Sequence, residues 1–502
     1  MPSSHQTPAI RRLWNYATGY RKRIVIASIY SFLNKAVDLA PPFLIGMAID
    51  VVVNGSDSYL GSLGVEDPKA QIIVIAAATF VIWGLESWFE YLLGIEWRNL
   101  AQSIQHDLRV ETYGHLQELD VEYFENRSSG DLMAVLNDDV NQLERFLDIG
   151  ANEVIQVVTT VVLIGLAFFL IAPSVAWLAF LPIPVILWGS FKFQQSIEPK
   201  YALVRDEAAT INSQLANNIG GITTIKAFNA QEREVERVEE ASSNYQEANR
   251  AAIKLSSAFT PLIRIAILIG FTATLVWGGF QAIDGTLNVG LYSVMVFLTQ
   301  RLLWPLTRLG QTVDLYQRAM ASTNRILDVL DTEPTIVDGS TRIDVAATRG
   351  RVEFDDVGFA YDEGFPVLEG ANLTIDPATT TAFVGSTGSG KTTLVKLLLR
   401  FYDVGSGSIR LDGLDVRDMP QEGLRDTMAL VSQDVFLFHG TVAENIAYGK
   451  PDAKRDDIEA AAALAEAHEI NTEMPNGYET IVGERGQKLT RGQRQRHTIA
   501  RD

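Results

Sequence analysis

Residues 385–392 are Gly385-Ser386-Thr387-Gly388-Ser389-Gly390-Lys391-Thr392. The segment 380–384, Thr-Thr-Ala-Phe-Val, precedes them and predicts a buried strand, and residues 393–401 have the pattern of a helix. Glycines in such a loop let backbone N–H groups converge on phosphate oxygens, and the N-terminus of the following helix adds partial positive charge. The stretch therefore predicts a phosphate-binding loop between a strand and a helix.

Two side chains at the end of this loop have chemistry that suits a nucleoside triphosphate. Lys391 is expected to reach the β- and γ-phosphates, and the hydroxyl of Thr392 can bind Mg²⁺. The next residue, Thr393, begins the helical run and completes the predicted nucleotide-binding set. We expect the ligands ATP and Mg²⁺ at residues 385–393.

The chain upstream of this loop has the composition of a membrane protein. Its 502 residues are enough for two or three domains, and the long apolar runs lie before about residue 310. A membrane span needs about 20 mostly apolar residues. Six stretches qualify: 24–52, 71–95, 153–172, 174–192, 258–282 and 290–309. The first contains Lys35 and Asp38, and Pro41-Pro42 predicts a kink in it.

Basic residues indicate how these spans are oriented. Lys and Arg concentrate in the N-terminal segment and in residues 96–152 and 193–257, whereas the loops 54–70, 172–174 and 283–289 contain one Lys and no Arg. Cytoplasmic loops carry the excess of positive charge. We therefore expect a multi-pass protein of the cell membrane whose N-terminus, long loops and C-terminal soluble domain are cytoplasmic.

The two long loops have helical periodicity, as in residues 102–119 and 202–216, and so predict membrane helices that continue into the cytoplasm as hairpins. Residues 126–131 and 218–221 interrupt them. Each interruption is either a simple turn or a contact surface for the soluble domain.

Charge and cysteine content exclude several functions. The net charge is -19, which argues against nucleic acid as a partner. The acidic excess fits a halophilic host or an ordinary acidic bacterial protein. The absence of cysteine excludes disulfides and thiolate metal sites. Charged residues inside the spans indicate either a cavity for amphipathic or cationic substrates, or structural ion pairs such as Lys35 with Asp38; the others are Glu86, Glu90 and Arg264.

Further motifs give the chain a resemblance to the ABC exporters that covers nearly its whole length. They are Phe359-Ala360-Tyr361, Val431-Ser432-Gln433-Asp434 with residues 438–446, Gly483-Glu484-Arg485-Gly486, and residues 129–132, 137–140 and 221–228 in the two hairpins. The resemblance implies a multidomain fold. Residues 1–330 would form an all-α domain of six transmembrane helices with long cytoplasmic hairpins, residues 331–350 a linker, and residues 351–502 an α/β P-loop NTPase domain, incomplete at its C-terminus.

The same resemblance implies roles for single residues. Tyr361 would stack on adenine, and Gln433 would contact Mg²⁺ and the attacking water. Leu489-Thr490-Arg491-Gly492-Gln493 corresponds to the family signature Leu-Ser-Gly-Gly-Gln, which faces the ATP bound by a second half-transporter, identical or different. Arg491 adds bulk and a fixed charge where the family has glycine, so the signature is either degenerate or a tolerated variant.

The family's Walker B aspartate, catalytic glutamate and switch histidine would follow Asp502, and His497 is not that histidine. Two functions stay open at this point. One is an ATP-driven exporter subunit whose substrate is unknown and which contacts membrane lipid. The alternative is an ATP-binding but hydrolysis-incompetent fragment, or the degenerate half of a heterodimer. Without the missing strand, we expect residues 335–502 to be unstable alone; cooperative thermal unfolding of them would contradict this.

Overall fold

The structure, a computed structural model, describes residues 7–361, 365–433, 435–483, 486 and 488–501. The chain forms two compact units. The first contains the residues up to Glu118 and Ser128–Thr332, and the second contains Leu119–Arg127 and the residues from Glu333 onward. The tip of the first long loop, Leu119–Arg127, therefore packs within the second unit.

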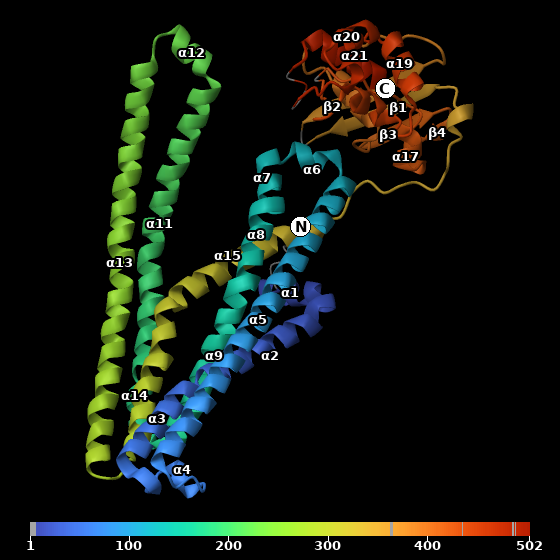
Figure 1. The fold of residues 1–502 in the computed structure, drawn as a ribbon. Coiled ribbons are helices and arrows are strands. Elements are labelled where there is room, and N and C mark those ends of the chain that lie inside the picture. The colour runs from blue at the N-terminus through green and yellow to red at the C-terminus, as the bar shows by residue number, and fades with distance from the viewer. Residues whose placement is uncertain (1–6, 362–364, 434, 484–485, 487, 502) are drawn as a thin grey trace. The chain divides into compact units, whose positions relative to one another are not determined.

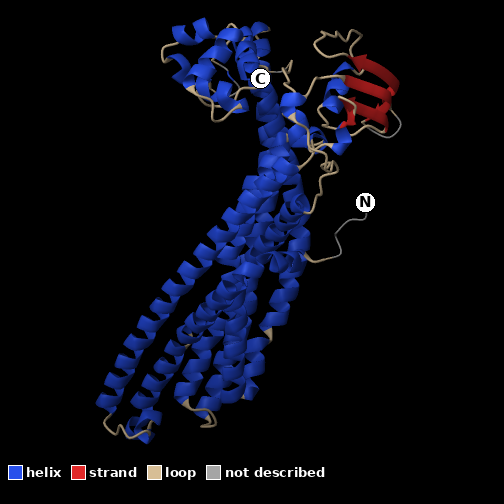
Figure 2. Cartoon of the chain, turned by 90° about the vertical axis from the view of Figure 1, so that its right-hand side faces the viewer, coloured by secondary structure: helices blue, strands red, loops and turns tan. Residues whose placement is uncertain are grey.

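The described residues of the first unit form helices joined by loops and short turns (Figures 1 and 2). The helices are α1 Ala9–Tyr16, α2 Arg21–Asp38, α3 Ala40–Asn54, α4 Tyr59–Ser62, α5 Pro68–Glu118, α7 Ser129–Ala134, α8 Val140–Arg145, α9 Ala151–Ile171, α10 Pro173–Phe180, α11 Pro182–Gly220, α12 Ile222–Ala227, α13 Gln231–Ile283, α14 Val289–Leu303 and α15 Leu309–Leu330.

Among the described residues of this unit, six helical segments are long and apolar enough to cross a membrane, and each contains or overlaps one of the six predicted spans. α2 and α3 form the first and are separated only at Leu39. The predicted kink is confirmed there: Pro41 and Pro42 lie in the first turn of α3, where a missing N–H costs no helical hydrogen bond. α5, α11 and α13 continue well beyond the predicted spans, so the helical hairpins are confirmed as well.

Close packing joins α3 to α14 near the loop at residues 54–70. A Cβ atom added to Gly46 would lie 2.3 Å from Val294 Cγ2 and 2.7 Å from the Gly290 carbonyl oxygen. Asn288 caps α14 by accepting bonds from the N–H groups of Gly290 and Leu291, and its amide donates to Asp50 Oδ1 at 2.9 Å. Small residues thus let two membrane helices approach, and a polar pair fixes their register.

Several charged side chains within the spans have partners. Lys35 Nζ lies 2.8 Å from Asp38 Oδ2, and Arg301 of α14 pairs with the same carboxylate. The predicted pairing of Lys35 with Asp38 is therefore confirmed, with a second cation that the sequence did not indicate. Arg264 lies over the ring of Trp304, 5.3 Å from its centroid.

The second unit contains a small antiparallel sheet, with strand order β2-β1-β3-β4. The strands are β1 Val352–Ala360, β2 Pro366–Ile375, β3 Ser406–Leu411 and β4 Leu414–Asp415. The helix after the phosphate loop, α16 Lys391–Leu398, packs on this sheet because Leu397 shares a core with Phe354 and Ile409. The sheet thereby supports the phosphate loop.

The prediction of a buried strand before the phosphate loop is wrong. Residues 380–384 form no strand, and the side chain of Val384 is 91% exposed. A strand needs a neighbour whose N–H and C=O groups complete the ladder. Within the residues that the structure describes, no strand pairs with this segment. These five residues alone could not distinguish a paired strand from an unpaired extended segment.

The remaining helices of the second unit are α6 Val121–Glu125, α17 Gln421–Arg425, α18 Val442–Ile446, α19 Arg455–Leu464, α20 His468–Glu473 and α21 Arg491–Arg501. Four of them, α18 to α21, lie around a second hydrophobic core. Its buried members include Val442, Ile458, Ala462 and Tyr478. The unit thus has two cores, one under the sheet and one among these helices.

Candidate nucleotide site

The phosphate loop has the backbone geometry that its glycines permit. Gly388 and Gly390 have φ angles of 86° and 83°, a left-handed conformation that other residues rarely adopt. A Cβ atom on Gly390 would also lie 3.0 Å from Leu368 Cδ2 of strand β2. The loop residues 385–389 are exposed, so their backbone faces solvent and can accept a ligand.

Lys391 lies over this loop. Its Nζ atom donates to the carbonyl oxygens of Gly385 at 3.0 Å and Ser386 at 2.8 Å. The adjacent Thr392 is exposed in the first turn of α16, where its hydroxyl is free to meet a metal ion. Among the described residues, no three His, Asp or Glu side chains form a metal cluster. A Mg²⁺ ion here would therefore take most of its ligands from phosphate and water.

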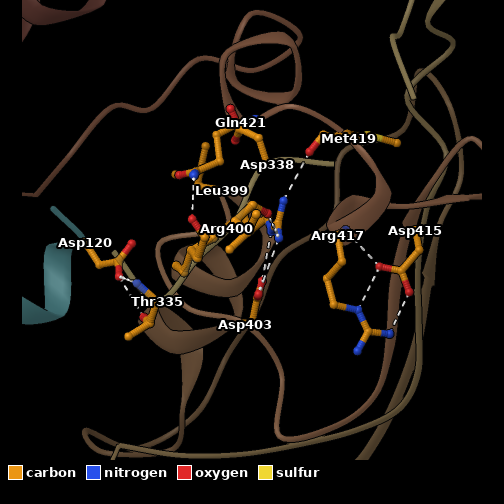
Figure 3. A network of polar contacts seen from close by, with 12 residues as sticks. Asp120, Thr335, Asp338, Leu399, Arg400, Asp403, Asp415, Arg417, Met419 and Gln421 are labelled. Carbon is orange, nitrogen blue, oxygen red and sulfur yellow. Dashed lines mark hydrogen bonds and ion pairs between the residues drawn. The ribbon is translucent and has the colours of Figure 1, made fainter. Parts of the chain in front are cut away.

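Arg400 fixes the other end of α16 (Figure 3). Its side chain is buried and its φ is 52°, which ends the helix earlier than the predicted residue 401. The guanidinium donates to the carbonyl oxygens of Met419 at 3.1 Å and Val337 at 2.9 Å, and pairs with Asp403 at 2.9 Å. The bond to Val337 anchors the phosphate-loop helix to the segment before the sheet, and the bond to Met419 anchors it to the segment after β4.

Tyr361 lies beside α16, where the sequence predicted an adenine platform. Its hydroxyl is 3.1 Å from the Thr393 hydroxyl, so the aromatic residue and the loop helix are directly joined. The Tyr361 ring packs edge-to-face with Phe359 and Tyr402, at centroid distances of 4.9 and 5.2 Å. It remains 39% exposed. Thr393 itself is buried, and its hydroxyl forms its hydrogen bond with Tyr361.

Sequence reasoning missed an ionic contact next to this platform. Glu125 of α6 accepts bonds from Lys396 Nζ at 2.7 Å and from the Tyr402 hydroxyl at 2.7 Å. Burial raises the pKa of Glu125, but these two bonds outweigh it and hold the pKa below its usual value. Burial lowers the pKa of Lys396, but the bond to Glu125 outweighs it and keeps the pKa above normal. Both groups are therefore charged at neutral pH.

The other predicted site residues are not all brought together. Gln433 is exposed, and among the described residues no hydrogen bond or ion pair joins it to the phosphate loop. Asp434, Glu484 and Arg485 lie outside the described residues. Gly486 is buried against Arg494 and Leu437.

The segment 489–493 leads into α21 and contains its first residues. The N–H of Thr490 donates to Gln493 Oε1 at 2.8 Å, and the N–H of Gln493 donates to Thr490 Oγ1 at 3.3 Å, which is a reciprocal helix cap. Threonine thus does what serine would do at this position. Arg491 is exposed in the first helical turn. His497 is buried with Nε2 2.6 Å from Asn471 Oδ1, and burial lowers its pKa, as expected for a core residue.

Six membrane-spanning helices on the same chain as a phosphate loop and an aromatic platform define a class of protein: a membrane transporter driven by a nucleotide. The ABC transporter transmembrane region family matches residues 24–306, and the ABC transporter domain family matches residues 368–502. The chain belongs to the ABC transporters, as an ATP-driven exporter of the half-transporter type, and its cassette binds ATP.

Individual relatives agree with this assignment over nearly the whole chain. The uncharacterized ABC transporter ATP-binding protein YknV of Bacillus subtilis is 32% identical, over 98% of this chain and 80% of that protein. The ATP-dependent lipid A-core flippase of Syntrophus aciditrophicus is 29% identical over the same shares. The structure of a bacterial Atm1-family ABC exporter with ATP bound is 26% identical, with a TM-score of 0.79 over 96% of this chain and 83% of that one.

Proposed function

We propose that residues 385–393 bind the phosphates of Mg²⁺-ATP and that Tyr361 stacks on the adenine. The observation that carries this proposal is the bond between Tyr361 and Thr393, because it couples the aromatic platform to the phosphate-loop helix. Lys391 releases its loop carbonyls and pairs with the β- and γ-phosphates. The hydroxyl of Thr392 binds Mg²⁺, and Gln433 is its second protein ligand.

Replacing Thr392 by valine tests the metal assignment, because valine keeps the shape of the side chain and removes its oxygen. With EDTA present, we expect Thr392→Val to bind ATP as wild type does. When Mg²⁺ is added, we expect the gain in ATP affinity to be about tenfold smaller in Thr392→Val than in wild type. Titrating a fluorescent ATP analogue with and without Mg²⁺ measures this. An unchanged Mg²⁺ effect would exclude Thr392 as a ligand.

We also propose that two such chains form the transporter and that segment 489–493 of one faces the ATP of the other. The N-terminus of α21 provides N–H groups and partial positive charge for a phosphate. Arg491 adds a full charge in that first turn. The domain limits proposed for this assembly are 1–330 for the membrane domain, 331–350 for the linker and 351–502 for the cassette.

The proposed orientation puts the N-terminus, both hairpins and the cassette in the cytoplasm. The chain has no cysteine, so single cysteines report topology without background. We expect Ser56→Cys to react with a membrane-impermeant maleimide on intact cells and Ser213→Cys to react only after permeabilisation, since both positions are exposed in the structure. Labelling of Ser213→Cys on intact cells would reverse the orientation.

For the substrate we propose an amphipathic, lipid-like molecule. The lipid A-core flippase is a relative over almost the full chain, which supports this class. Partly buried charges in the spans, such as Glu86 and the pair of Asp38 with Arg301, place polar groups among the apolar residues of the membrane helices. A headgroup and an acyl chain require that combination.

A further inference from the structure

The short helix α6 is part of the same compact unit as the cassette, although it lies more than 200 residues before it in sequence. Two carboxylates join it to that unit. Asp120 accepts bonds from the Thr335 N–H at 2.6 Å and the Thr335 hydroxyl at 2.7 Å (Figure 3). Glu125 accepts bonds from Lys396 and Tyr402. The first contact holds the segment before the sheet, and the second reaches α16.

The two partners of Glu125 are also the neighbours of the adenine platform. Lys396 Nζ lies over the Tyr361 ring, 5.3 Å from its centroid, and over the Tyr402 ring at 5.6 Å. The rings of Tyr361 and Tyr402 meet at 90°. Because the ammonium group lies over one face of Tyr361, a flat base would stack on the other face.

Glu125 holds Lys396 and Tyr402 in place around the Tyr361 ring. A lysine has a flexible four-carbon stem and a strongly hydrated head, so it does not stay over an aromatic ring without a fixed partner. Glu125 supplies that partner through both carboxylate oxygens, at 2.7 and 2.9 Å from Nζ. The same carboxylate orients the Tyr402 hydroxyl and thereby the ring that packs on Tyr361.

We propose that Glu125 is a positioning residue for the nucleotide base: through Lys396 and Tyr402 it sets the orientation of Tyr361, so that a helix of the first hairpin belongs to the base subsite. This rests on the proposed nucleotide site. Coupling between two sites is reciprocal, so a bound base also strengthens the contact between α6 and the cassette. Phosphate binding at residues 385–392 does not depend on Glu125.

The test compares two ligands that differ in the base. Full-length protein is purified in detergent, and the Kd values of Mg²⁺-ATP and of inorganic triphosphate are measured for wild type and Glu125→Gln. Glutamine keeps the size and one acceptor oxygen but removes the charge. We expect the Kd for ATP to rise about fivefold to twentyfold and the Kd for triphosphate to stay within about twofold. Glu122→Gln is the matched control, with the same change on the same helix, and we expect it to bind both ligands like wild type.

Two more variants decide the outcome if Glu125→Gln proves unstable. Tyr402→Phe keeps the ring but loses the hydroxyl that Glu125 orients, and Lys396→Met keeps the stem but loses the cation. We expect both to weaken ATP and to leave triphosphate unchanged. Equal weakening of both ligands in these variants, or no change in ATP affinity, would overturn the role of Glu125. Failure of the nucleotide site itself has a different signature, because Lys391→Ala would then leave both ligands bound as in wild type.

Discussion

Lys391→Ala is expected to weaken ATP binding by about 100-fold. In the structure, the ammonium group of Lys391 already lies over the loop, bonded to two backbone carbonyl oxygens. It needs only to exchange these neutral acceptors for phosphate oxygens, and a charge-assisted hydrogen bond contributes about 1.5–3 kcal/mol. Alanine removes both the charge and the donors and leaves the glycine geometry of the loop intact.

The measurement is a titration of full-length protein in detergent with Mg²⁺-ATP, alongside thermal unfolding to check that the variant is folded. Lys450→Ala is the matched control, since Lys450 is an exposed lysine of the same unit and lies outside the proposed site. A variant that binds ATP as tightly as wild type would remove the phosphate loop from the proposed function.

Gly46→Val is the second change for which we expect a large effect, here on stability. A Cβ atom at position 46 would lie 2.7 Å from a backbone oxygen of Gly290, which cannot move away without shifting α14. The same shift would break the bond from Asn288 to Asp50. Overpacking of this kind costs about 3 kcal/mol, and in a membrane no hydrophobic gain between helices offsets it.

The expected result is a lower temperature at which the purified protein loses its monodisperse peak in size-exclusion chromatography after heating. Gly84→Val is the control, because a Cβ atom at position 84 would have no neighbour within 4 Å. If both variants were equally stable, the approach of α3 to α14 would not limit the stability of the membrane unit.

The sequence predicts the membrane half well because composition determines it. A long apolar run can cross a bilayer as a helix, because a helix satisfies all of its backbone hydrogen bonds internally. The interruptions at 126–131 and 218–221 contain residues that end helices. The phosphate loop can be predicted equally well from the sequence, because its glycine spacing is specific to that kind of loop. The pairing of Lys35 with Asp38 followed from a spacing of three residues on a helix, which brings their side chains together.

The parts that could not be predicted depend on contacts between distant residues. Nothing in the residues around Glu125 indicates that it meets Lys396 and Tyr402, because no motif links them. The segment 380–384 has the composition of a strand, but a strand also requires a neighbour, and pairing is not a property of one segment. Gln433 illustrates the same limit, since its motif names a role but does not determine where the side chain lies.

The division of the cassette into two cores has a consequence for how it loses structure. Residues that support the phosphate loop, such as Phe354 and Leu397, belong to one core, and those that support the start of α21, such as Val442 and Ile458, belong to the other. Each core can then open as its own cooperative unit. Amide protons near the phosphate loop and near Thr490 would exchange with solvent at rates set by separate equilibria, and damage to one half would leave the other folded.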